Sequence, residues 1–162
     1  MDKLTLSHFI KQKAKDYGFA LCGFAKAEVL DKEKIYLSKW LSEKKNAGME
    51  WMNNSFEKRV NPFLIFPEAK SIISLAYVYD TPFEHSEDKN IAKISRYAWG
   101  EKDYHKVIKK KLKPFCAEIE SLLPEIKTRA YVDDGPMMDK VWAIKSGIGQ
   151  QGKHTNIINP EI

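Results

Sequence analysis

A continuous run of apolar and β-branched residues, Ser71–Tyr79 (SIISLAYVY), constrains the fold more than any other segment of the chain. Such a run is typical of a strand whose two faces are both covered. Helical periodicity precedes and follows it, over residues 5–17, 31–48 and 102–123. Helices that alternate with strands predict an α/β fold. We therefore expect a single-domain α/β sandwich over residues 1–162, in which helices cover a central mixed sheet.

Shorter segments extend this prediction. Apolar runs at residues 19–24, 127–132 and 155–158 predict further strands. A short helix is predicted over residues 137–146, because a proline can begin its first turn. Pro114 lies inside the long helical pattern and is expected to kink that helix or split it in two.

Charge and hydropathy limit the classes of function. No apolar run approaches the roughly 18 residues that span a bilayer, and Met1–Thr5 do not begin a signal peptide. We therefore expect a cytoplasmic protein with no membrane partner. The net charge of +5 permits a polyanionic partner but does not require one. The densest basic run, at residues 106–113, is interpreted as a solvated helix face.

The cysteine content excludes one kind of metal centre. Cys22 and Cys116 are the two cysteines of the chain, and both are interpreted as small core residues. Because there is no CxxC motif, this chain alone cannot ligate an iron–sulfur cluster or a structural zinc ion through thiolates.

An acidic turn follows the predicted strand at residues 127–132. Asp133 and Asp134 are expected where this strand hands over to a helix, and ligands of α/β sheets gather at the carboxyl ends of strands. A carboxylate there can cap the helix, bind a ligand or act as a general acid. The local sequence leaves these three roles open.

A glycine-rich basic turn comes next, with the pattern Gly147-x-Gly149-x-x-Gly152-Lys153-His154. The glycine spacing is that of a dinucleotide fingerprint, but it follows a predicted helix rather than a strand. The turn either suits the close approach of a flat or anionic ligand, or is a plain loop after the end of a helix.

Two further segments could contribute to a site. Residues 94–105 combine aromatic residues with an arginine, a histidine and acids, and Trp99 among them is either a stacking surface or a core residue. Arg59 is a candidate anion contact, since a guanidinium group offers a planar fork of donors, and a surface salt bridge is the alternative.

In their order along the chain, six segments resemble the N-terminal half of epoxyqueuosine reductase, the cobalamin-dependent enzyme of queuosine-tRNA biosynthesis. Each segment is weak alone, but the ordered set is specific and covers nearly the whole chain. The segments are GMEWM (48–52), RVNP (59–62), FPEAKSIISL (66–75), ISRYAWGEKDYHKV (94–107), YVDDGPMMDK (131–140) and AIKSGIGQQGKHT (143–155).

The resemblance implies a base-off cob(II)alamin held in an α/β domain, beside a ferredoxin-like domain whose two [4Fe–4S] clusters feed electrons to cobalt. The implied reaction reduces epoxyqueuosine to queuosine in a tRNA anticodon loop, with an aspartate as proton donor. By motif position that aspartate is Asp133. The resemblance further implies a monomer, with a cofactor-binding set made of Arg59, Tyr97, Asp133, Lys153, His154 and Ile157.

Two departures from the family pattern affect these expectations. Gln150 stands where the family usually carries tryptophan, which changes one apolar wall of the implied corrin pocket. The cysteine-rich segments that should follow are missing, so we expect a truncated form, a natural fragment or a relic that is inactive without its [4Fe–4S] half. The alternatives are a stand-alone corrinoid-binding or trafficking module, and a cofactor-free interaction domain in which Asp133 is only a helix cap.

Overall fold

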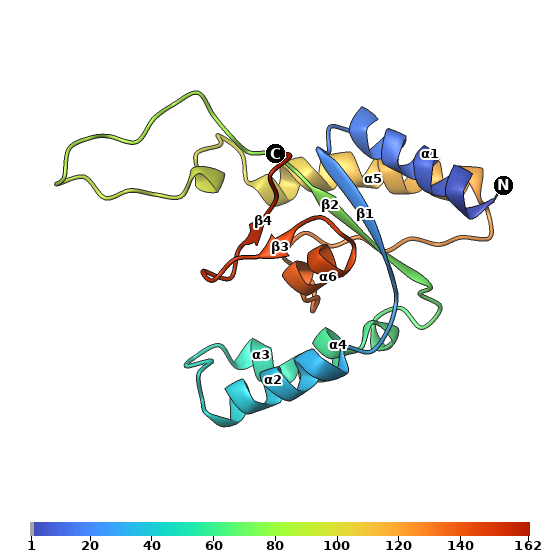
Figure 1. The fold of residues 1–162 in the computed structure, drawn as a ribbon, viewed down its shortest axis with the longest axis horizontal. Helices are drawn as coiled ribbons and strands as arrows, with labels where there is room; N and C mark the ends of the chain where they lie inside the picture. Colours follow the sequence, from blue (N-terminus) through green and yellow to red (C-terminus); the bar gives the residue numbers. More distant parts are fainter. Residues whose placement is uncertain (1) are drawn as a thin grey trace. The chain divides into compact units, whose positions relative to one another are not determined.

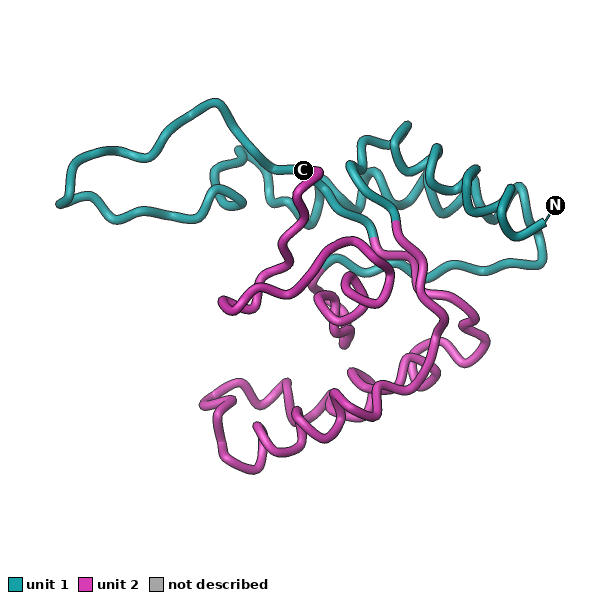
Figure 2. Tube along the Cα trace, viewed as in Figure 1, with its two compact units in different colours: residues 1–22, 75–132, 162 teal, residues 23–74, 133–161 magenta. Residues whose placement is uncertain are grey.

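The computed structural model describes residues 2–162 and has mixed α/β architecture, which confirms the predicted fold class. The chain divides into two compact units (Figure 2). Unit 1 comprises residues 1–22, 75–132 and 162, and unit 2 comprises residues 23–74 and 133–161. That the two units form a single domain stays a prediction.

Unit 1 is built on two helices, α1 (Lys3–Asp16) and α5 (Tyr104–Leu122), which lie side by side in Figure 1. The Asp2 carboxylate accepts hydrogen bonds from the backbone of the first turn of α1, so this helix begins earlier than its apolar pattern predicts. The Tyr17 hydroxyl, 3.0 Å from Glu118, donates to this carboxylate on α5. The buried hydrophobic residues of this unit are Ile10, Ala14, Phe19, Leu112, Phe115, Ile119 and Val132.

Helix α5 begins at the cap residue Asp103, whose carboxylate accepts a hydrogen bond from the His105 amide at 2.9 Å. It continues through Pro114 as one helix of 19 residues. Of the two outcomes expected at Pro114, a kink or a split, the split does not occur. A short 3-10 helix, η2 (Arg96–Ala98), precedes α5.

Strand β1 (Leu21–Lys26) pairs with β2 (Ser71–Ala76), which confirms the strongest strand signal over its first six residues. Ala20 N–H donates to the Ala76 carbonyl and Ala27 N–H donates to the Lys70 carbonyl, so the strands run in opposite directions.

Unit 2 gathers short helices around one buried cluster. The cluster consists of Leu30, Leu37, Val60 and Trp142. The helices are α2 (Asp31–Ser42), α3 (Glu50–Asn54), α4 (Phe56–Val60), the 3-10 helix η1 (Pro62–Leu64) and α6 (Asp139–Lys145). Helices α2 and α4 pack together, as Figure 1 shows.

A second small sheet belongs to unit 2. Strands β3 (Gln150–Gln151) and β4 (Ile157–Ile158) pair antiparallel, with Gln150 opposite Ile158 and Gln151 opposite Ile157. Where the sequence led us to expect one central mixed sheet, the described residues form two small sheets of two strands each.

The strand predicted at residues 127–132 is not formed. Both the amide and the hydroxyl group of Thr128 donate to the Glu120 carboxylate, at 2.6 and 2.7 Å. The Thr128 amide therefore bonds to a side chain of α5 instead of a neighbouring strand. Across residues 2–162, every helix is too short or too polar to cross a membrane.

Candidate functional site

The predicted acid lies in a constrained turn of unit 2, which we call the Asp133 loop (residues 133–138). Asp133 has a φ of 54°, in the left-handed region that few residues other than glycine adopt. Such backbone is retained where the surrounding structure enforces it, and it is frequent at functional sites. The N-cap position of α6 is Met138 and no side chain caps this helix, so Asp133 does not act as its cap.

A second carboxylate, Asp139, follows the loop in the first turn of α6. Asp139 is exposed, but desolvation of its carboxyl group by the protein atoms around it raises its pKa. The charge of Asp133 raises the pKa of Asp139 further, whereas the charge of Arg59 lowers it. Asp133 and Arg59 therefore both act electrostatically on Asp139, in opposite directions.

The side chain of Arg59 reaches from α4 to the Asp133 loop. Its Nε donates to Ser55 Oγ at 3.0 Å, and its Nη1 donates to the Met137 carbonyl oxygen at 3.4 Å. The guanidinium carbon lies 4.9 Å from the centroid of the Trp51 ring. Partial burial lowers the pKa of Arg59 by desolvation, although the group stays charged at any physiological pH.

The glycine-rich turn forms the β3–β4 hairpin. Gly147 has a φ of 76° immediately after α6, which confirms the helix-end interpretation for this glycine. A Cβ at Gly149 would lie 2.5 Å from the Ile158 carbonyl oxygen, so only glycine fits there. Lys140 of α6 donates to the Asn156 side chain at 3.1 Å, which ties the hairpin to the helix that carries Asp139.

The predicted site residues fall in both units. Asp133 and Arg59 both belong to unit 2, where each acts electrostatically on Asp139. Lys153 and His154 are exposed on the hairpin turn of the same unit, and Ile157 begins β4.

Tyr97 belongs to unit 1. Its ring makes edge contacts with Tyr79 and Tyr104, at centroid distances of 6.5 and 5.8 Å. The side chain of Tyr97 is 53% exposed, so one side of this aromatic group is open to solvent. The assignment of all six residues to a cofactor site stays a prediction.

Sequence reasoning missed Asp139. The available signal was an acid six residues after Asp133, just beyond the GPMM turn, where a short loop can bring two carboxylates together. It also missed Ser55 and Trp51, which orient the Arg59 side chain.

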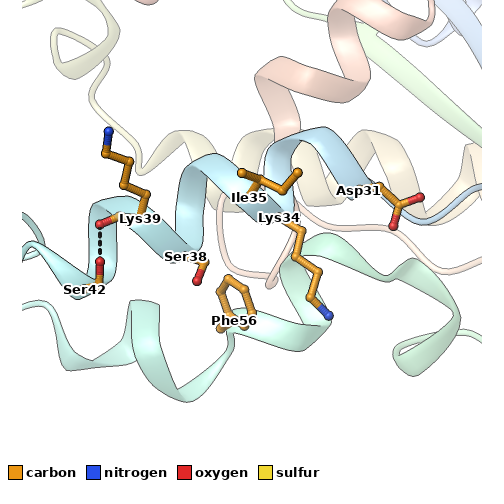
Figure 3. Close-up of a pocket in the computed structure, with 7 residues that line it drawn as sticks. All are labelled: Asp31, Lys34, Ile35, Ser38, Lys39, Ser42 and Phe56. Carbon is orange, nitrogen blue, oxygen red and sulfur yellow. Dashed lines mark hydrogen bonds between the residues drawn. The ribbon is translucent and has the colours of Figure 1, made fainter.

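A separate hollow of about 600 Å³ lies along α2 and α4 (Figure 3). The Ser42 hydroxyl donates to the Lys39 carbonyl at its edge, at 2.8 Å. The Lys34 ammonium group, which lines the hollow, forms an ion pair with Glu57 at 3.0 Å. No predicted site residue lines this hollow, whose walls are Asp31, Lys34, Ile35, Ser38, Lys39, Ser42 and Phe56.

Metal-binding side chains do not cluster in the part of the chain that the structure describes. No group of three or more His, Cys, Asp or Glu residues could hold a metal ion among residues 2–162. Burial raises the pKa of the Cys22 thiol to about 11 and also raises the pKa of Cys116. Both thiols therefore stay protonated at neutral pH, and the protonated form is a poor metal ligand.

The raised pKa of Asp139 predicts a pH-dependent gain in stability for Asp139→Asn. Because the folded chain binds this proton more tightly than the unfolded chain, ionisation costs stability as pH rises above the ordinary value of 3.8. At pH 7 the variant should be more stable than the parent, by less than about 1 kcal/mol since the carboxyl group still meets water. Urea unfolding at several pH values measures the difference.

This gain should vanish at the acidic end of the series, where the carboxyl group is protonated in both states. Glu68→Gln removes an exposed carboxylate of the same unit and should leave stability unchanged at every pH. A constant difference between parent and Asp139→Asn across the series would contradict the electrostatic explanation.

Comparison with known proteins places these features in a family context. Residues 59–134 match the family model described as epoxyqueuosine reductase QueG, DUF1730. The epoxyqueuosine reductase of Cellulophaga algicola is 45% identical over 152 residues, which cover 94% of this chain and 49% of that protein. The chain spans about half the length of the curated relatives it matches.

Solved structures of epoxyqueuosine reductases share the fold. The Streptococcus thermophilus protein has a TM-score of 0.84 at 32% identity, covering 96% of this chain and 42% of that one. A crystal structure with an epoxyqueuosine-modified tRNA-Tyr stem loop has a TM-score of 0.77 at 29% identity, covering 98% and 42%. The Bacillus subtilis protein, whose aspartate-bearing catalytic loop is swung out of the active site, has a TM-score of 0.79 at 30% identity, covering 98% and 42%.

Proposed function

We propose that this chain, which belongs to the epoxyqueuosine reductase family, is the cobalamin-binding and substrate domain of an enzyme that reduces epoxyqueuosine to queuosine in tRNA. We propose that it acts in the cytoplasm as a monomer. The observation that carries the proposal is the Asp133 loop. It places the aspartate assigned by motif position in a constrained turn beside a second carboxylate and an arginine.

The chemistry of epoxide reduction gives Asp133 its role. Cleaving a carbon–oxygen bond of an epoxide leaves an alkoxide-like oxygen, and an acid within hydrogen-bond reach lowers the barrier by protonating it. The Bacillus subtilis relative carries an aspartate on its catalytic loop, which supports the same role for Asp133. Desolvation and then the charge of Asp133 raise the pKa of Asp139, so a second carboxyl group near the loop ionises less readily than an ordinary aspartate.

The β3–β4 hairpin fits a corrinoid through its donor set. A corrin ring carries amide side chains that both donate and accept hydrogen bonds. The hairpin exposes amides at Gln150 and Gln151, together with Lys153 and His154. When bound, cobalamin would supply the reduced cobalt that carries the epoxide chemistry, and the protein would supply its binding and orientation.

The [4Fe–4S] clusters implied by the family do not fit the residues of this chain. Its two cysteines are partly buried, their thiol pKa values are raised, and they lie far apart in sequence. We therefore assign no electron-transfer step to this chain, and a reductant has to be supplied in any assay.

The basic face of α5 supports an RNA partner. Lys106, Lys109, Lys110 and Lys113 are exposed and recur at three- or four-residue intervals, which places them on one side of the helix. A lysine row of this kind suits the phosphates of a nucleic acid backbone, and such contacts weaken as salt concentration rises. The relative crystallised with a modified tRNA stem loop favours tRNA over other polyanions.

Addition of cob(II)alamin to the purified chain tests the proposal. We expect retention of the corrinoid on desalting, with visible and electron paramagnetic resonance spectra of the base-off form. The double variant Lys153→Ala/His154→Ala should bind more weakly, because it removes two polar groups of the hairpin turn. With a chemical reductant and epoxyqueuosine tRNA, the loaded protein should form queuosine.

Each step of this experiment can contradict the proposal. Loss of all cobalamin on desalting would favour a cofactor-free interaction domain. Tight binding without queuosine formation under chemical reduction would favour a stand-alone corrinoid-binding or trafficking module.

A further inference from the structure

We propose that Arg59 is a positioning residue that latches the Asp133 loop onto helix α4. This inference rests on the proposed function only in treating the loop as catalytic. The resemblance predicts that Arg59 contacts the cofactor, and the structure shows contacts of its side chain with Ser55, Trp51 and Met137. They join two segments of unit 2 that lie 78 positions apart in the chain.

The anchor side of the latch fixes the direction of the guanidinium group. Ser55 Oγ accepts the Arg59 Nε–H at 3.0 Å and donates its own hydrogen to the Trp51 carbonyl at 2.6 Å. The Trp51 ring lies against the guanidinium at 4.9 Å. With one edge and one face occupied, the Nη1 group is directed toward the loop, and little rotamer entropy remains to be lost.

The loop side of the latch is the backbone of the residue before the α6 cap. Arg59 Nη1 donates to the Met137 carbonyl oxygen at 3.4 Å. The charge of Arg59 also attracts Asp139, on the far side of the same turn. Because Met137 and Met138 pack partly against the buried cluster of unit 2, movement of the loop has to withdraw both side chains from it.

A latch of this kind sets the fraction of molecules in which the Asp133 loop is in an open position. The Bacillus subtilis relative has been seen with its aspartate-bearing loop swung out, so loops of this family occupy more than one position. A hydrogen bond to a charged donor favours the closed position, and its loss should raise the open population by about tenfold. Arg59 would thereby control how much of the time Asp133 can reach a substrate.

Methyl NMR of the whole chain tests the latch without cofactor or RNA. The chain has five methionines, which single Met→Leu substitutions can assign. In Arg59→Gln we expect microsecond-to-millisecond exchange at the Met137 and Met138 methyl groups, with an open population about tenfold larger than in the parent. The signal of Met52 should stay sharp and show that the fold is intact.

Matched variants separate the latch from a general loss of charge. Lys58→Gln removes the neighbouring, exposed positive charge and should behave as the parent. Ser55→Ala frees the guanidinium and should show the same exchange as Arg59→Gln to a smaller extent, which keeps the test decisive if Arg59→Gln folds poorly. Arg59→Lys should be intermediate, because an ammonium group cannot reach Ser55 and Met137 in the same fork geometry.

Unchanged Met137 and Met138 signals in Arg59→Gln, or equal exchange in Lys58→Gln, would overturn the latch. Cobalamin affinity is measured on the same variants. If Arg59→Gln lost cobalamin affinity without added exchange at the Met137 and Met138 methyl groups, Arg59 would be assigned to cofactor binding instead. Failure of the parent chain to bind cobalamin would contradict the proposed function and leave the latch standing.

Discussion

Asp133→Asn is expected to lower the rate of queuosine formation by at least about a hundredfold, the usual contribution of a general acid. Asparagine keeps the shape of the side chain and tolerates the left-handed backbone at φ 54°, so the loop should retain its structure. It cannot release a proton at neutral pH. Single-turnover assays with cobalamin-loaded protein, chemical reductant and epoxyqueuosine tRNA measure the change.

Two comparisons make the interpretation of Asp133→Asn specific. Asp134→Asn makes the same change one residue further along the loop and should keep most of the rate. Cobalamin affinity should be nearly equal in the parent and in both variants, because the loss is confined to proton transfer. A full rate in Asp133→Asn would remove the proton-donor assignment.

Local signals in the sequence predicted the elements well where the local chain decides the outcome. The pattern at residues 5–17 and the glycine after it correspond to α1, and the observed start differs because Asp2 caps the first turn. The strand predicted over Ser71–Tyr79 formed over Ser71–Ala76, where β-branched and apolar residues favour pairing with a neighbouring strand.

Predictions failed where a side chain from another element decides the outcome. Residues 127–132 have a strand-like composition, but the hydrogen-bond donors of Thr128 are taken by Glu120 on α5. The contacts of Arg59 with Met137 and its electrostatic effect on Asp139 likewise depend on how α4 packs near α6, which no short motif encodes. Asp133 was selected from the motif and its role as the acid stays a prediction, whereas its neighbour Asp139 and the contact of Arg59 with Met137 became visible only in three dimensions.

Trp142→Ala is expected to lower the free energy of unfolding by about 3–5 kcal/mol, the range for removing a fully buried tryptophan. Trp142 is 2% exposed and lies in the buried cluster with Leu30, Leu37 and Val60. Its truncation would leave a cavity between α6 and the helices that it packs against. Urea unfolding followed by circular dichroism measures the loss without relying on tryptophan fluorescence.

Trp142→Phe should cost far less, about 1.5 kcal/mol or below, for a reason specific to this site. The indole Nε1–H is buried and has no hydrogen-bond partner among the described residues, and an unsatisfied buried donor costs about 1–3 kcal/mol. Phenylalanine removes that donor, and the free energy gained in this way offsets part of the cost of the small cavity that the substitution leaves. Tyr36→Ala, at a position 63% exposed on α2, should change stability by less than about 0.5 kcal/mol. A loss in Trp142→Phe as large as in Trp142→Ala would show that the indole N–H is satisfied in solution, for example by a buried water molecule.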